Sequence, residues 1–200
     1  MLTTPPSSQP QSQSDTTTTA AAPLLFTIHG SPISGRGAFA ACDIPPHQVI
    51  LREPPLLLVT AHTSLCTAFE RLDDADKHLA LGLCANEDRY KDGTPKIQAI
   101  WATNSFATQQ GQGGLFPVSA RFNHACRPGS NVDYYYDNQN NELVLKSGSQ
   151  AIKKEQELTI SYMLDASPAQ LYAAYGFQCR CGYCPGLSNE NLRKMLDNLW

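Results

Sequence analysis

Three cysteines near the end of the chain constrain the fold more than any other feature. Cys179, Cys181 and Cys184 form a C-x-C-x-x-C pattern within six residues of this 200-residue sequence. Thiolates at this spacing suit one zinc ion, but a structural zinc takes four ligands and one tight loop supplies three comfortably. We therefore expect a distant residue to complete the site and to hold the end of the chain against an earlier segment.

Cys126, in the segment NHACRP, is the strongest candidate for the fourth ligand. It lies more than fifty residues before Cys179, so the bond would hold the chain end beside Asn123 and His124. Two alternatives stay open: His124 as the ligand, or three free thiols with a buried Cys126. The remaining cysteines are isolated in the sequence, and we expect them to be small, buried, apolar residues; they are Cys42, Cys66 and Cys84.

The composition indicates one domain without a general nucleic-acid surface. The chain is 42% hydrophobic, which suffices for a sizeable core, and its net charge is -3. No apolar run approaches the roughly 18–20 residues of a membrane span. Residues 1–23 are rich in Thr, Ser, Gln and Pro and predict a disordered tail without a secretory signal. An odd number of cysteines, seven, favours a reducing compartment, the cytoplasm or the nucleus.

The pattern of apolar residues predicts a mainly β fold with a helical insertion at about residues 62–107. Short strands are expected from residue 24 to 59, in a hairpin over 131–147 and at ELTISY (157–162). Within the insertion, residues 65–83 follow a helical period, and a second helix should place Asn104 on its apolar face. Asn104 is then either an exposed helix end or a ligand contact. Ser167 and Pro168 predict the start of another helix, and a terminal helix should follow the cysteines.

Four short motifs carry the candidate chemistry, and each is weak alone. They are GRGAF (35–39), FNHAC (122–126), ELTISY (157–162) and YGFQCRCGYC (175–184). The glycines of GRGAF permit a close backbone approach to a ligand, but no further glycine and no helix follow. This excludes the dinucleotide fingerprint and the phosphate loop. Their order along the chain is more specific than any single motif.

In this order, the motifs resemble the SET domain of protein-lysine methyltransferases. The closest likeness is to SET-and-MYND proteins and to MYND-less fungal-type SET proteins, through TNSFATQQGQGGLFPVSARFNHAC (103–126). The cysteines and histidines of a MYND zinc module are absent from the sequence. The resemblance implies a SET fold of small curled β-sheets with a pseudoknot over residues 24–177. It also implies a post-SET zinc segment and terminal helix over residues 178–200.

The resemblance also implies a role for each motif residue. S-adenosylmethionine (AdoMet) would be bound by Gly35, Arg36, Gly37, Asn104, Asn123, His124, Tyr162 and Phe177. Tyr162 would be the catalytic tyrosine, with Tyr175 and Phe177 lining the lysine channel. One structural zinc would be held by Cys126, Cys179, Cys181 and Cys184. The partner would be a protein that presents a lysine to a monomeric enzyme, without nucleic-acid or membrane binding.

The chemistry agrees with these residue types. Methyl transfer from a sulfonium to an amine is an in-line displacement, and the amine must arrive neutral although free lysine has a pKa near 10.4. A narrow apolar channel and the sulfonium charge both disfavour the ammonium form. Catalysis then consists mainly of alignment in a dry site, which requires no general base.

The sequence also departs from the family pattern. The usual N-H-S-C-x-P-N reads NHACRPGSN here, so Gly129 and Ser130 are inserted before Asn131, and Ala125 replaces the serine. We expect the altered loop to affect substrate access. The chain ends at Trp200 without the large helical domain of SET-and-MYND enzymes, so we expect an open groove.

Two other functions remain as alternatives. One is a catalytically silent SET module that acts as a scaffold, and the other is a zinc module with thiol redox chemistry. The triple tyrosine at 134–136 favours strand packing over a methyl-lysine cage.

Overall fold

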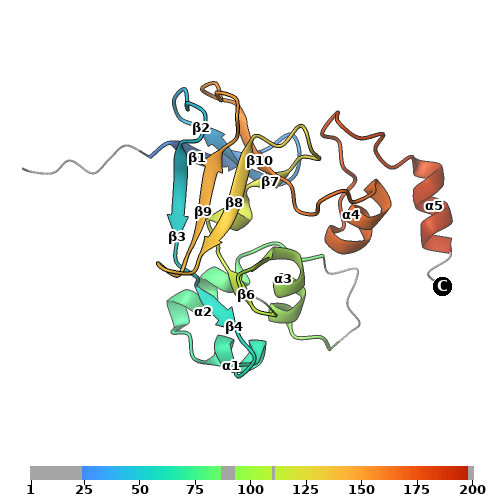
Figure 1. Ribbon diagram of the computed structural model, residues 1–200. Helices are drawn as coiled ribbons and strands as arrows, with labels where there is room; N and C mark the ends of the chain where they lie inside the picture. Colours follow the sequence, from blue (N-terminus) through green and yellow to red (C-terminus); the bar gives the residue numbers. More distant parts are fainter. Residues whose placement is uncertain (1–23, 87–92, 110, 198–200) are drawn as a thin grey trace, which may run out of the picture.

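The computed structural model describes residues 24–86, 93–109 and 111–197 (Figure 1). The predicted disordered tail, residues 1–23, lies outside the described residues. Within the described part of the chain, no helix has the length and apolar character that a membrane crossing requires.

Three small β-sheets form the body of the molecule. The first has the order β1 (Phe26–Gly30), β2 (Arg36–Ala40), β10 (Glu157–Ile160) and β7 (Asn123–His124). The second has the order β3 (Val49–Glu53), β9 (Glu142–Ser147) and β8 (Val132–Asp137). The third has the order β4 (Leu57–Val59), β6 (Gly113–Leu115) and β5 (Ser105–Ala107). The hairpin predicted over residues 131–147 is confirmed as the β8–β9 pair.

One parallel pairing brings two of the sequence motifs together. Strand β10 runs parallel to β7, with Thr159 opposite Asn123 and Ile160 opposite His124. The backbone N–H of Ala125 continues this contact by donating to the carbonyl oxygen of Ile160 over 3.0 Å. Tyr162 follows β10 by two residues, so the pairing places it beside His124.

The predicted helical stretch over residues 65–83 is two helices. Helix α1 (Leu65–Glu70) has Ser64 as its N-cap, and α2 (Asp74–Leu81) has Asp73 as its N-cap. The Asp73 carboxylate accepts a hydrogen bond from the backbone N–H of Asp76 and caps the start of a new helix, after the first has ended at Glu70. Helix α3 (Lys96–Asn104) has Asn104 as its last residue.

Helix α4 (Pro168–Tyr175) has clear signals at both ends. Ser167 and Gln170 form a capping box, and Pro168 occupies the first helical position, as predicted. Gly176 ends the helix with a φ of 75°, in the left-handed region that glycine tolerates. The chain then turns toward the cysteines, and α5 (Asn189–Asp197) follows them (Figure 1).

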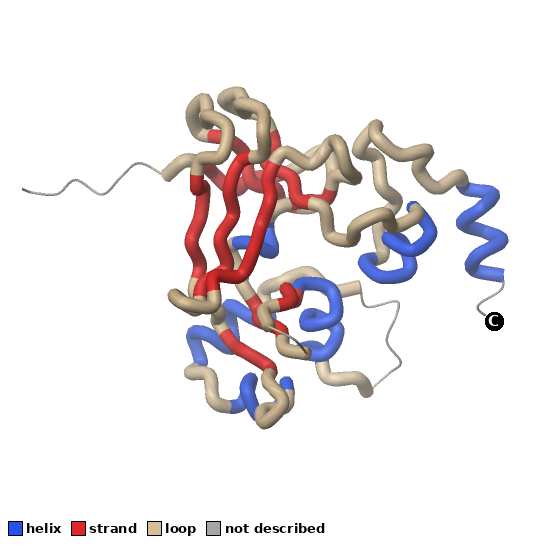
Figure 2. The backbone as a smooth tube through the Cα atoms, in the orientation of Figure 1, coloured by secondary structure: helices blue, strands red, loops and turns tan. Residues whose placement is uncertain are grey.

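Two apolar clusters form the core. The first lies between the first two sheets and includes Phe116, Phe122 and Leu145, all fully buried. The second packs the helices of the insertion against β4 and β6 and includes Ile100 and Leu115. Figure 2 shows the strands gathered on one side, with the insertion helices at one end and α4 and α5 beside them. The predicted fold class, mainly β with a helical insertion, is confirmed.

Candidate functional site

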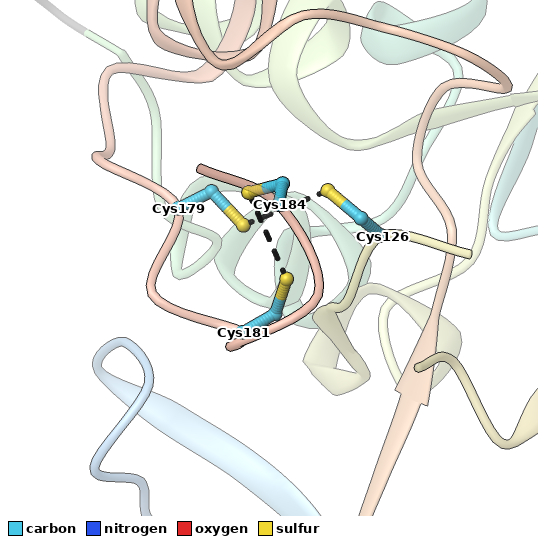
Figure 3. Close-up of side chains that lie close together, drawn as sticks. All are labelled: Cys126, Cys179, Cys181 and Cys184. Atoms are coloured by element: carbon cyan, nitrogen blue, oxygen red, sulfur yellow. Dashed lines mark hydrogen bonds between the residues drawn. The ribbon is translucent and has the colours of Figure 1, made fainter. Parts of the chain in front are cut away.

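The four predicted metal ligands converge although one is far from the others in sequence. The sulfur atoms of Cys126, Cys179, Cys181 and Cys184 all lie within 4.8 Å of one another (Figure 3). The Sγ atoms of Cys126 and Cys179 are 3.8 Å apart, and those of Cys181 and Cys184 are 3.9 Å apart. A regular tetrahedron with Zn–S bonds of about 2.3 Å has edges of about 3.8 Å. The dimensions of the cluster therefore fit a tetrahedral zinc.

The thiols of the cluster differ in how readily they ionise. Burial raises the pKa of Cys126 far above its usual range, and a hydrogen bond with Cys184 raises it further. Burial also raises the pKa of Cys179, to about 11. Burial opposes ionisation of Cys181 as well, but hydrogen bonds from the backbone of Cys126 and Tyr183 lower its pKa to about 7. A bound cation would stabilise the thiolate form of all four groups.

His124 joins the cysteine cluster to Tyr162. Its Nδ1 accepts a hydrogen bond from the backbone N–H of Tyr162 at 3.1 Å, so the ring proton lies on Nε2. Nε2 is 3.2 Å from the Cys126 Sγ and donates to it. Burial lowers the pKa of His124 to about 4, so the ring is neutral at physiological pH. With both nitrogens occupied, His124 supports a cysteine of the cluster rather than completing it.

A cleft of about 490 Å³ lies beside this cluster. This volume is in the range of small-molecule sites. Seven of the eight residues predicted to bind AdoMet line the cleft: Gly35, Arg36, Asn104, Asn123, His124, Tyr162 and Phe177. Gly37 is buried in β2 and does not line it. The cleft also includes Tyr175, at the end of α4.

The two asparagines of the cleft use their amide nitrogens on the protein itself. The Asn123 Nδ2 donates to the carbonyl oxygens of Ser34 and Arg36. The Asn104 Nδ2 donates to the carbonyl oxygens of Cys84 and Ile100, at 2.6 and 2.8 Å. These bonds fix the amide orientation and leave the Oδ1 atoms, which are hydrogen-bond acceptors, for a ligand. Asn104 is thus both the last residue of α3 and a residue of the cleft, and a ligand contact stays a prediction.

A second, narrow cavity of about 40 Å³ meets the cleft. The two spaces share Thr103, Asn104, Ala120, Tyr162 and Tyr175. The narrow cavity is otherwise lined mainly by aromatic and apolar side chains, including Phe106, Phe122, Tyr134 and Ile160. This aromatic passage adjoins the cleft at the shared residues, an arrangement that would let two reactants approach one point from different sides.

Tyr162 lies where the two spaces meet. Its hydroxyl donates to the carbonyl oxygen of Phe122 at 3.0 Å. Burial, with a further contribution from the nearby Tyr175, holds the pKa of Tyr162 well above its usual range. The ring centroids of Tyr162 and Tyr175 are 4.9 Å apart, and those of Tyr162 and Phe177 are 6.1 Å apart. Tyr162 is therefore a neutral phenol held in an aromatic cluster.

Two residues of the narrow cavity were missed in the sequence. Phe106 lies in the stretch that carries the resemblance, and its ring contacts Tyr134 edge-on at 5.3 Å. The expected strand packing accounts for Tyr136, whose ring centroid is 6.2 Å from that of Phe116. It accounts for only part of the position of Tyr134. Tyr134 lines the cavity, and burial raises its pKa. Three adjacent tyrosines give no sign of which one faces a ligand, because a strand alternates its faces.

The expectation of buried single cysteines was wrong. Cys42, Cys66 and Cys84 are all exposed. Cys42 follows the end of β2, Cys66 lies on the outer side of the short helix α1, and Cys84 lines the cleft. Short elements leave many positions at the surface, so residue type alone did not predict burial here.

The inserted loop packs against the cysteine loop. The Gly129 backbone N–H donates to the carbonyl oxygen of Cys126 at 2.7 Å. A Cβ atom at Gly129 would lie 2.0 Å from the ring of Tyr183, so only glycine allows this close approach. Neither inserted residue lines the narrow cavity. The insertion therefore contacts the metal-ligand loop directly, rather than the aromatic passage.

Comparison with known proteins agrees with this arrangement. The sequence profile described as "SET domain" matches residues 35–163, well over half of the chain. The chain belongs to the SET domain family. Within that family it is similar to the histone-lysine N-methyltransferase set5 of Schizosaccharomyces pombe, with 22% identity over 177 residues. That match covers 86% of this chain and 54% of set5.

Further similarities are shorter or more distant. The histone-lysine N-methyltransferase ATXR2 of Arabidopsis thaliana is 32% identical over 74 residues, which is 35% of this chain and 15% of ATXR2. The chain thus spans about half or less of the curated relatives it matches. Among solved structures, the SET domain of LSMT bound to lysine and AdoHcy has a TM-score of 0.54 at 15% identity, covering 79% of this chain and 54% of that chain. Rubisco LSMT bound to AdoMet gives 0.53 at 15% identity, covering 79% and 53%. These structures confirm the SET fold.

Proposed function

We propose that this protein is an AdoMet-dependent protein-lysine N-methyltransferase. The observation that carries the proposal is the meeting of a cleft and a narrow aromatic passage at Tyr162. A methyl donor in the cleft and a lysine in the passage would face each other across this residue. The alignment of two reactants is the main catalytic requirement of an in-line methyl transfer.

The cleft residues offer complementary groups for AdoMet. The Oδ1 atoms of Asn123 and Asn104 can accept hydrogen bonds from an ammonium or an amine, since their nitrogens are already bonded. Phe177 and Tyr175 present aromatic surface on which an adenine can stack. His124 would contact the cofactor through its backbone, because both ring nitrogens have protein partners. When bound, AdoMet supplies an electrophilic methyl group on a sulfonium.

The narrow passage favours a neutral lysine. The rings of Phe106, Tyr134, Tyr162 and Tyr175 line it, and among the described residues no carboxylate does. Desolvation in such a passage disfavours the ammonium form of a substrate lysine. The Tyr162 hydroxyl, held by the Phe122 carbonyl, can orient the amine, and the aromatic faces can stabilise a methylammonium product by about 0.5–2 kcal/mol.

The metal has a supporting role in this proposal. A zinc held by Cys126, Cys179, Cys181 and Cys184 would fix the segment that follows α4. Phe177 lies two residues before Cys179 and lines the cleft, so its position would depend on this bond. The zinc would thus complete one wall of the cofactor site without taking part in the chemistry.

The names of the relatives indicate the class of substrate. Two relatives are named histone-lysine N-methyltransferases, which supports a histone or another lysine-bearing protein as the substrate. The net charge of -3 supports an enzyme that does not bind nucleic acid directly. We further propose that it acts as a monomer in the nucleus or the cytoplasm. The likeness of TNSFATQQGQGG to SET-and-MYND proteins supports that subgroup.

One experiment tests the proposal directly. The purified protein is incubated with AdoMet carrying a labelled methyl group and with a protein extract or core histones, and labelled residues are identified by mass spectrometry. We expect the label on lysine side chains of specific proteins. Binding of AdoMet without any labelled lysine would contradict the proposal and would support a silent SET scaffold.

A further inference from the structure

One partly buried hydrogen-bond network adjoins the cofactor cleft, and the proposed mechanism does not use its carboxylate. It consists of the Glu157 carboxylate and the groups around it: Ser31, Asn123 and Gly37. We refer to it below as the Glu157 network. Glu157 is the first residue of β10, five residues before Tyr162, and none of its atoms lines the cleft.

The contacts of Glu157 are numerous and short. Both carboxylate oxygens accept the Ser31 hydroxyl, at 2.7 and 2.9 Å. Oε1 also accepts from the Asn123 Nδ2 at 2.8 Å. Hydrogen bonds to an ionised acceptor are roughly twice as strong as neutral ones. Glu157 therefore links the residue before the GRG turn to the asparagine of the cleft.

Ser31 passes this connection to the turn that precedes β2. Its hydroxyl oxygen accepts from the backbone N–H of Ile33 at 2.9 Å and of Ser34 at 3.4 Å. Its own N–H donates to the Gly35 carbonyl oxygen at 2.9 Å and closes the turn. Ile33, Ser34 and Gly35 all line the cleft. The shape of this cleft wall thus depends on where Glu157 holds Ser31.

Gly37 makes room for the carboxylate. A Cβ atom at this position would lie 2.2 Å from the Glu157 Oε1 and 3.0 Å from the Asn123 Nδ2. The second glycine of the motif therefore faces the network, whereas Gly35, with a φ of 48°, forms the turn beside the cleft. The two glycines have different tasks, one on each side of the wall.

We infer that Glu157 is a positioning residue for the cofactor. It holds the 31–37 turn and the Asn123 amide in the arrangement that receives the ligand, without touching the ligand itself. Because Nδ2 of Asn123 is bonded to a carboxylate and to carbonyl oxygens, the amide orientation is fixed and Oδ1 is left as the acceptor for a ligand. This inference rests on the proposed use of the cleft for AdoMet.

The test compares Glu157→Gln with Glu155→Gln, an exposed glutamate whose one side-chain contact is a 3.9 Å ion pair with Lys154. The dissociation constant of S-adenosylhomocysteine is measured by calorimetry, together with the melting temperature. Loss of hydrogen bonds to an ionised acceptor should raise the Kd about tenfold in Glu157→Gln. We expect a melting temperature within a few degrees of the parent and an unchanged Kd in Glu155→Gln. A lower melting temperature with an unchanged Kd would overturn the inference, since it would mean a purely structural role.

A double-mutant cycle provides a second test. Gly37→Ala should weaken cofactor binding by displacing the carboxylate, but much less so in a Glu157→Ala background, where the obstructing oxygen is absent. The factor by which the double variant raises the Kd should therefore be smaller than the product of the factors of the two single variants. Fully multiplicative losses would show that Gly37 and Glu157 act independently.

Hydrogen exchange separates this inference from the proposed function. In the ligand-free protein, the backbone amides of Ile33 and Ser34 should exchange faster in Glu157→Gln than in the parent. If the parent binds no S-adenosylhomocysteine, the proposed function fails, and this local exchange then decides the role of Glu157 alone. Equal exchange rates at residues 31–37 in both proteins would overturn the inference.

Discussion

Residues 24–162 and residues 163–194 supply facing walls of one cleft, but different forces hold them in place. The first part contains both apolar clusters, with thirteen buried residues in one and seven in the other. In the second part, Leu171 and Cys179 are the buried residues among those described. Figure 1 shows α4 and α5 beside the sheets rather than within them.

This difference explains why the cysteines are where they are. Two buried residues cannot hold a segment of about thirty against its conformational entropy. A zinc bound through Cys126 would provide that stabilisation, since thiolate–zinc sites contribute binding free energies of about 10–16 kcal/mol in small domains. The body of the molecule thus depends on apolar packing, whereas the last wall of the site would depend on a metal held by the four cysteines.

The largest effect should follow from breaking the metal link. Cys126→Ser removes the ligand that comes from the body, so the protein should lose its stoichiometric zinc and residues 163–194 should detach. Metal analysis and limited proteolysis check this: the segment should be cut rapidly while the body stays intact. Cys42→Ser, which changes an exposed cysteine, is the control and should keep its zinc. A full zinc content in Cys126→Ser would contradict the metal site.

The converse change should weaken the body and spare the metal. Leu145 in β9 is fully buried in the first apolar cluster. Leu145→Ala should lower the free energy of unfolding by about 2–5 kcal/mol, from lost burial and a residual cavity. Denaturant unfolding measures this, and zinc content should remain at one per chain. Loss of zinc from the folded variant would show that the two regions are not independent.

His124 belongs to the first region, but its ring centroid is 5.8 Å from that of Phe177 in the second region, so its replacement should have an intermediate effect on both. His124→Gln removes a ring whose nitrogens join the Cys126 sulfur to the backbone of Tyr162. Replacing a side chain that hydrogen-bonds a metal ligand typically lowers metal affinity by about 10–100-fold. Competition with a chromogenic chelator measures the zinc affinity, and the exposed His78→Gln is the control. Unchanged affinity in His124→Gln would mean that the contact has no influence on the metal.

The smallest expected effect concerns charge on the body alone. The backbone N–H of Lys154 and the ammonium of Lys153 hold the pKa of Asp43 below its usual 3.8. Because the folded-state pKa is lowered, Asp43 stabilises the protein above about pH 3.8, and this contribution is lost as the pH falls below that value. Asp43→Asn should therefore be slightly less stable than the parent at pH 6, and this difference should shrink as the pH falls below 3.8. Equal stability of the two proteins at pH 6 would contradict this role.

The sequence predicted the local structure well where residues act on their neighbours. Ser167, Pro168 and Gly176 determine the ends of α4 by short-range hydrogen bonds and backbone preferences. The two strand-like runs around an Asn-rich turn in residues 131–147 predicted the hairpin. The helix period over residues 65–83 was less informative, because the Asp73 cap interrupts it without changing the apolar pattern.

The site residues that belong to a sequence motif could be predicted. Those whose role depends on contacts between distant parts of the fold could not. The four cysteines share one chemistry, so their convergence followed from counting ligands. The role of Gly37 depends on Glu157, which is distant in sequence and reaches it through the pairing of β10 with β2. Tyr134 faces Phe106 across two different sheets, and no local pattern reports such a contact.

The central claim is that methyl transfer takes place where the cleft and the passage meet, at Tyr162. Tyr162→Phe keeps the ring and its packing but removes the hydroxyl that donates to the Phe122 carbonyl. The direct measurement is the rate of lysine methylation by parent and variant at saturating AdoMet, with zinc content and cofactor affinity determined on the same samples. We expect the variant to bind cofactor and zinc normally and to lose about 10²–10³-fold in kcat. Equal methylation rates in the two proteins would contradict the account.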